Sequence, residues 1–100
     1  MYYKFTSDIS RLGPILTPYV LEIEDDFITY SKRNKNLFNK DTITIDIVNI
    51  SLTKVNSSLL GTTLTIVSLS GEEIIVKNMN IKDAKEAESI IKKLRKQKSL

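Results

Sequence analysis

The chain has 100 residues and a mass of 11.4 kDa, and it contains no cysteine, histidine or tryptophan. The missing cysteine and histidine exclude disulfides, thiolate nucleophiles, histidine general bases and most transition-metal sites. The formal charge is +3, but five of the 15 basic residues follow residue 91, and ten basic residues face twelve acidic ones before it. This composition disfavours an enzyme, a cofactor and a generally basic nucleic-acid-binding protein.

The length and the apolar content of 41% predict one domain over residues 1–100 with a modest core. No apolar run reaches the roughly 20 residues that a membrane span needs. The first residues also lack the apolar stretch of a secretory signal. We therefore expect a cytoplasmic protein, with the membrane surface as the one other location to consider.

Residues 1–15 are interpreted as an N-terminal extension outside the main β pattern. Ser7 is a suitable cap for a short helix over 8–12, which Gly13 and Pro14 would end. Tyr2, Tyr3 and Phe5 make this segment apolar enough to require burial. It would cover the protein's own sheet or reach across to another subunit.

The first hairpin is predicted from alternating apolar residues on either side of an acidic turn. Residues 19–23 alternate with a period of two, as a half-buried strand does. Glu24-Asp25-Asp26 forms the turn, and residues 27–32 form the returning strand. Because charges crowd naturally at a hairpin tip, we interpret this cluster as a solvated turn and not as a metal site.

Residues 31–40 are rich in Lys and Asn and are predicted to be a loop. Its apolar pair, Leu37-Phe38, would press into a membrane interface or a partner groove. Alternatively, the pair would fold back onto the core while the lysines keep this end of the sheet soluble. The candidate interaction residues of this basic loop are Lys32, Arg33, Lys35, Leu37, Phe38 and Lys40.

The clearest strand is residues 42–47, where isoleucines occupy the odd positions and polar residues the even ones. After Ile47 the pattern changes parity, because Ile50 and Leu52 are the next apolar positions. A slip of one residue would expose the whole apolar set. We therefore expect a bulge or sharp bend at Val48-Asn49 and a strand over 50–55. A connection then opens at Asn56-Ser57-Ser58 and is closed by Gly61.

A second hairpin is predicted over 62–69 and 72–77, joined by a two-residue turn at Ser70-Gly71. The period then becomes helical. Asn80 is a candidate N-cap, and the helix is expected to run over 80–97. Its apolar stripe consists of Ala84, Ala87, Ile91 and Leu94.

This order of elements, with strands over 16–78 and then one helix, resembles a pleckstrin-homology (PH)-like domain, in particular the GRAM and bacterial PH domains. The residues that carry the likeness are Tyr19-Val20-Leu21-Glu22-Ile23, Phe27-Ile28-Thr29-Tyr30-Ser31, Ile45-Asp46-Ile47-Val48-Asn49-Ile50, Leu64-Thr65-Ile66-Val67, Gly71, Ile74-Ile75-Val76 and Asp83-Ala84. The resemblance implies a barrel of six to seven antiparallel strands in two nearly orthogonal sheets, capped by the helix.

The resemblance implies a binding role without fixing the ligand, since one fold hosts many sites. Lipid-binding members carry basic residues where this chain has Glu22, Glu24, Asp25 and Asp26. These carboxylates would repel an inositol phosphate, so phosphoinositide binding at the usual pocket is not expected.

The basic residues of the last helical turns have two interpretations. They complement the negative end of the helix dipole, or they form a patch for an anionic surface. These candidates are Lys92, Lys93, Arg95 and Lys96.

The leading hypothesis is a non-catalytic module that binds a protein or peptide, or itself, through a strand edge or groove. The alternative is a peripheral membrane module that uses the basic loop together with the C-terminal lysines.

Overall fold

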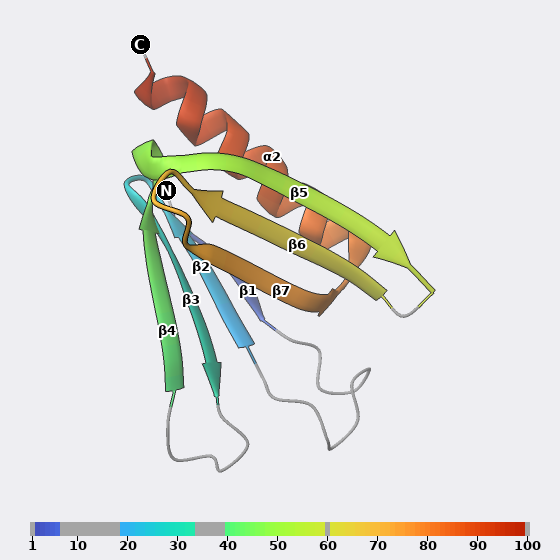
Figure 1. Cartoon of the computed structure of the whole chain (residues 1–100). Helices are drawn as coiled ribbons and strands as arrows, with labels where there is room; N and C mark the ends of the chain where they lie inside the picture. The colour runs from blue at the N-terminus through green and yellow to red at the C-terminus, as the bar shows by residue number, and fades with distance from the viewer. Residues whose placement is uncertain (1, 7–18, 34–39, 60, 100) are drawn as a thin grey trace.

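The computed structural model describes residues 2–6, 19–33, 40–59 and 61–99. These residues form two antiparallel sheets and one C-terminal α-helix (Figure 1). The mainly β prediction with a single closing helix is confirmed at this level. The strands are β1 (Tyr2–Thr6), β2 (Tyr19–Glu24), β3 (Phe27–Arg33), β4 (Lys40–Asp46), β5 (Ile50–Ser58), β6 (Gly61–Ser68) and β7 (Glu73–Met79), and the helix is α2 (Ile81–Lys98).

The four-stranded sheet A has the order β1-β2-β3-β4, and each strand pairs antiparallel with the next. The predicted hairpin around the acidic turn is confirmed as β2 and β3. The interpretation of the first residues as an extension outside the core is wrong for residues 2–6. They form β1, which pairs with β2, and Phe5 is buried in the core. The expected helix over 8–12 lies outside the described residues.

The bend expected at Val48-Asn49 is confirmed as a single turn of 3-10 helix, η1 (Ile47–Asn49), between β4 and β5. The Ile47 amide donates to the Asp26 carbonyl over 2.8 Å, which ties this corner to the β2–β3 turn. Ile47 and Ile50 are both buried, whereas Val48 is 61% exposed. The turn therefore accommodates the change in the apolar alternation, so that Ile47 and Ile50 both lie in the core.

The three-stranded sheet B has the order β5-β6-β7. Figure 1 shows that its strands run obliquely to those of sheet A. Leu52 was expected to face inward after Ile50, but it is 46% exposed. A bulge between Ile50 and Leu52 changes the register of β5 against β6 and turns Leu52 outward.

The turns of sheet B differ from those predicted. β5 continues through residues 56–58, where the Ser57 and Thr62 hydroxyls lie 3.2 Å apart, so the expected connection there is part of the strand. The β6–β7 loop spans residues 69–72 and is longer than two residues. Two hydrogen bonds fix the conformation of this loop. The Glu72 amide donates to the Ser68 hydroxyl, and the Leu69 amide donates to the Asn49 carbonyl.

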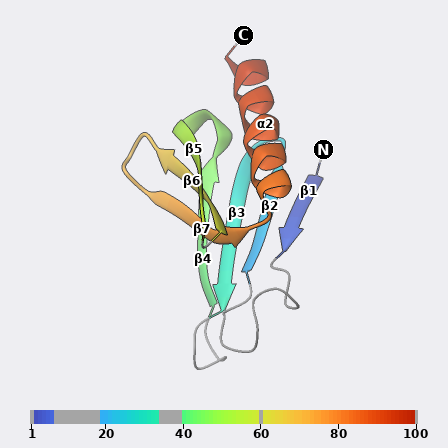
Figure 2. The same cartoon turned by 90° about the vertical axis from the view of Figure 1, so that its right-hand side faces the viewer.

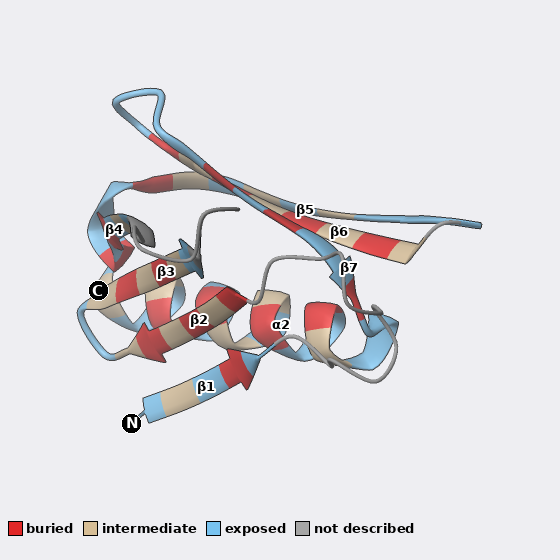
Figure 3. Ribbon diagram, turned by 90° about the horizontal axis from the view of Figure 1, so that it is seen from below, coloured by how far each residue is buried: buried red, intermediate tan, exposed pale blue. Residues whose placement is uncertain are grey.

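Helix α2 begins as its sequence predicts, since the Asn80 side chain accepts a hydrogen bond of 2.8 Å from the Lys82 amide. The predicted stripe is buried, and its members are Ala84, Ala87, Ile91 and Leu94. The helix contacts β5, β6 and η1, and Figure 2 shows it alongside both sheets. Buried residues recur along both sheets and along α2, where they form one core (Figure 3).

Two tyrosines of this core should titrate unusually late. The rings of Tyr19 and Tyr30 lie 6.2 Å apart, and each side chain is 7% exposed. Burial, with a contribution from the Asp83 carboxylate, raises the pKa of Tyr19 to about 12, and burial also raises the pKa of Tyr30. The unfolded chain releases the same protons at a pH of about 10.

The contribution of these two tyrosines to folding stability should therefore be constant up to a pH of about 10 and be lost as the pH rises toward 12, because the unfolded state loses its tyrosine protons first. Tyrosinate absorbance during a pH titration should show an ionisation step above the pH of about 10 of free tyrosine. Tyr19→Phe should remove the part of this step that has the highest pKa. A Tyr19 that ionises at a pH of about 10, as a free tyrosine does, would contradict this prediction.

Candidate functional site

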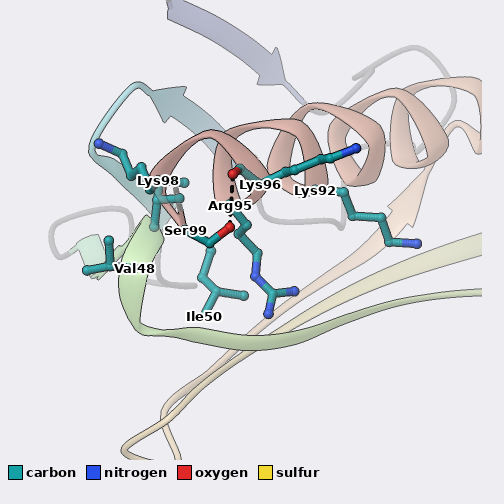
Figure 4. A pocket seen from close by; sticks show the side chains of 8 residues that line it. Val48, Ile50, Lys92, Arg95, Lys96, Lys98 and Ser99 are labelled. Carbon is teal, nitrogen blue, oxygen red and sulfur yellow. Dashed lines mark hydrogen bonds between the residues drawn. The ribbon is translucent and has the colours of Figure 1, made fainter.

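A groove with a volume of about 410 Å³ lies between the C-terminal end of α2 and the η1 corner (Figure 4). That volume lies in the range of about 300–1,000 Å³ that is usual for ligand clefts. We call it the cationic groove, and it is lined by Ile47, Val48, Ile50, Lys92, Arg95, Lys96, Lys98 and Ser99.

The helix period determines which basic residues reach the groove. Ile91 and Leu94 face the core, so Lys92, Arg95 and Lys96 lie at the border of the buried stripe. The opposite wall comes from η1 and the start of β5, where Val48 supplies most of the apolar surface and the largely buried Ile50 lies beside it. The groove thus combines an apolar wall with a cationic one.

The basic side chains of the groove differ in their ion-pair and hydrogen-bond partners. Lys98 Nζ lies 2.6 Å from a carboxylate oxygen of Asp26, and Lys92 Nζ lies 3.6 Å from one of Glu88. The Arg95 guanidinium donates to the Ser51 carbonyl over 3.2 Å. Within the described ranges, the Lys96 ammonium has no ion-pair partner. Lys96 is therefore the cation most available to an incoming anion.

An acidic hollow lies at the same end of the molecule. It has a volume of about 540 Å³ and is lined by Tyr2, Glu24, Asp25, Asp26 and Phe27. The hydrogen bond from Lys98 lowers the pKa of Asp26, and the hydrogen bond from the Tyr2 hydroxyl to Glu22 raises the pKa of Tyr2. The Lys98–Asp26 pair is thus the boundary between an acidic surface and the cationic groove.

The acidic turn was interpreted as solvated, and Asp26 is indeed exposed while it pairs with Lys98. Among the residues that the structure describes, no three Asp, Glu, His or Cys side chains are placed to hold a metal ion. What this end offers chemically is charge recognition by hydrogen bonding, with apolar surface beside it.

The structure separates the two groups of basic residues that were predicted from the sequence. Lys32 and Arg33 end β3 and Lys40 begins β4, at the bottom of Figure 1, whereas the C-terminal end of α2 lies at the top. The length of β3 between Phe27 and Lys32 corresponds to about 17 Å. Lys35, Leu37 and Phe38 lie outside the described residues. The two basic groups therefore lie toward opposite ends of sheet A.

Within the helix group, Lys92, Arg95 and Lys96 line the groove and Lys93 does not. Sequence reasoning missed the apolar wall and Lys98 as a structural cation. The change of parity at Val48-Asn49 was the available signal, since a bend there must bring its residues against another element. Which element that would be could not be read from the sequence.

Comparison of the chain with protein-family models, with curated proteins and with solved structures gives no match. In the described part of the chain, no helix combines the length and apolarity needed to cross a bilayer. A function for this chain therefore has to be argued from its own residues.

Proposed function

We propose that this chain is a PH-like binding module that holds an acidic segment of a partner protein in the cationic groove. The observation that carries the proposal is an apolar wall with Val48 and Ile50 opposite a wall with Lys96, whose ammonium has no ion-pair partner among the described residues. An extended segment with a carboxylate next to an apolar side chain is complementary to both walls.

The arrangement of the elements supports the PH-like part of the proposal. A meander of four strands is followed by a meander of three strands and a C-terminal helix that contributes to the same core. Six of these strands and the helix lie within residues 19–97, the part of the chain that carries the resemblance, and β1 precedes them. Closure of the two sheets into a barrel is part of the proposal.

The charges around the groove favour a narrow protein segment over a membrane. The Lys98–Asp26 contact fixes the acidic turn beside the groove, and Asp25 and Asp26 are both exposed. Because Lys98, which also lines the groove, contacts Asp26, a flat anionic surface laid over the groove would approach these carboxylates and be repelled by them. A single acidic segment can enter the groove and avoid them.

The experiment selects peptides from a displayed library of random sequences with the folded chain and then measures the affinity of the enriched peptides. We expect enrichment of Asp or Glu next to Leu, Ile or Phe. Lys96→Glu should weaken binding by about tenfold, because it reverses the charge of the free cation. Lys93→Glu is the matched control, since it changes the same charge one helical turn away and lies outside the groove lining.

Two results would contradict the proposal. One is a selection without acidic enrichment. The other is an equal loss of affinity in the Lys93→Glu and Lys96→Glu proteins, which would indicate general charge attraction. Binding to vesicles that contain phosphatidylserine is measured in the same way. If the chain binds these vesicles but no peptide, and Lys96→Glu abolishes that binding, the partner is a membrane and not a protein.

A further inference from the structure

We propose that two copies of this chain associate by antiparallel pairing of their β4 strands, which joins the two A sheets into one continuous sheet. The partner in this interaction is a second copy of the same chain. The inference is independent of the cationic groove, which lies on η1 and α2.

Three of the four sheet edges carry features that oppose the addition of a strand. β1 has only five residues, with the exposed Lys4 at its centre. β5 has a bulge after Ile50 and contacts α2. The Arg95 guanidinium also donates a hydrogen bond to the Ser51 carbonyl of this strand. β7 is irregular opposite Thr62–Leu64, where Asn78 adopts a φ of 61°.

β4 has none of these features. It pairs with β3 over seven consecutive positions, from Arg33–Lys40 to Phe27–Asp46, without a register shift. Residues 42–45 of this strand, between Asp41 and Asp46, carry no charge and no proline. No strand of the described chain pairs with the other side of β4. In an antiparallel ladder, alternate residues of such an edge direct their amides and carbonyls outward.

In one register the sequence of β4 is complementary to itself at five of its seven positions, the exceptions being Asp41 and Ile45, which lie opposite each other. Pairing about a two-fold axis at Ile43 places Lys40 opposite Asp46 of the partner subunit at both ends. Thr42 then lies opposite Thr44 of the partner subunit, and Ile43 lies opposite its own copy. A shift of two residues in either direction loses both charge pairs, and a shift of one residue sets inward positions against outward ones.

Asp46 and Ile43 are suited to this pairing. Asp46 is exposed, and although it stands at the N-cap of η1, its side chain makes no capping hydrogen bond. Its carboxylate is therefore not used to start that turn. Ile43 is half-buried against the core, and the matching residue of a second copy would cover its exposed part.

The test is a charge exchange measured by sedimentation equilibrium. Wild-type chain should show a concentration-dependent dimer. Asp46→Lys places like charges opposite each other at both ends, as does Lys40→Asp, and each variant should raise the dissociation constant by about tenfold. An equimolar mixture of the two variants should recover the wild-type dissociation constant as a heterodimer, because opposite charges then face one another again.

Lys54→Asp, an exposed position on sheet B, is the matched control and should leave dimerisation unchanged. Circular dichroism confirms that each variant is folded. Wild-type chain that remains monomeric up to about 1 mM, the weak end of specific association, would overturn the inference. So would variants that dimerise like the wild type, or a mixture that does not recover. Because the groove variants are separate, these outcomes are distinguishable from those of the peptide experiment.

Discussion

Replacing Ile47 by alanine is expected to lower the free energy of unfolding by about 2–5 kcal/mol. The side chain is fully buried in the η1 corner, where both sheets and α2 meet. Deleting its methyl and methylene groups removes apolar contact and leaves a cavity that the corner cannot fill, because the Ile47 amide is fixed to the Asp26 carbonyl. Urea denaturation followed by circular dichroism measures the loss, since the chain has no tryptophan for fluorescence.

Val48→Ala is the control for this corner. Val48 is the next residue of the same turn, but it is 61% exposed, so its truncation should cost less than about 0.5 kcal/mol. Ile47→Val should fall between the two variants, at about 0.5–1.5 kcal/mol. Equal losses for Ile47→Ala and Val48→Ala would mean that the corner is not packed as described.

Gly61→Ala is expected to destabilise the fold by about 1–3 kcal/mol. Gly61 begins β6 with a φ of 130°, a region that residues with a Cβ rarely adopt. An added Cβ would also lie 3.2 Å from Asn78 Oδ1 and 3.4 Å from Asn78 Cα. The backbone strain and the close approach to β7 therefore act together. The loss should appear as a lower denaturation midpoint with an unchanged dependence on urea.

Gly71→Ala separates these two causes. Gly71 also has a positive φ, of 96°, but an added Cβ there meets open space. Its substitution should cost backbone strain alone and destabilise the protein less than Gly61→Ala. A larger loss at Gly71 would show that the approach of Gly61 to Asn78 contributes nothing.

Local patterns were sufficient for several parts of the fold. The alternation in residues 19–23 and 27–32 predicted β2 and β3, because a period of two has one solution when one face is buried. The stripe that ends at Leu94 predicted the buried face of α2, and Asn80 predicted its first residue. The change of parity after Ile47 predicted a bend, since continuing the strand would have exposed its isoleucines.

Other parts depended on partners distant in the sequence. Tyr2–Thr6 carries a weak pattern, and it is a strand because β2 offers an edge on which Phe5 reaches the core. Leu52 looks like a core residue, yet a bulge that is set by pairing with β6 turns it outward. The length of the β6–β7 loop likewise depends on the bond from Leu69 to Asn49.

The candidate site shows the same division. The basic run of the last helical turns is visible in the sequence, and so is the absence of cysteine and histidine. The sequence by itself determined the mainly β character, the closing helix and the concentration of positive charge at its end, because these follow from periodicity and composition. Only the tertiary structure decided that Lys98 pairs with Asp26, and that Lys32 and Lys40 lie at the other end of sheet A. It also decided that Lys96 has no ion-pair partner in the described ranges. Those facts are contacts between residues far apart in the chain, and their geometry follows from how the two sheets and the helix share one core.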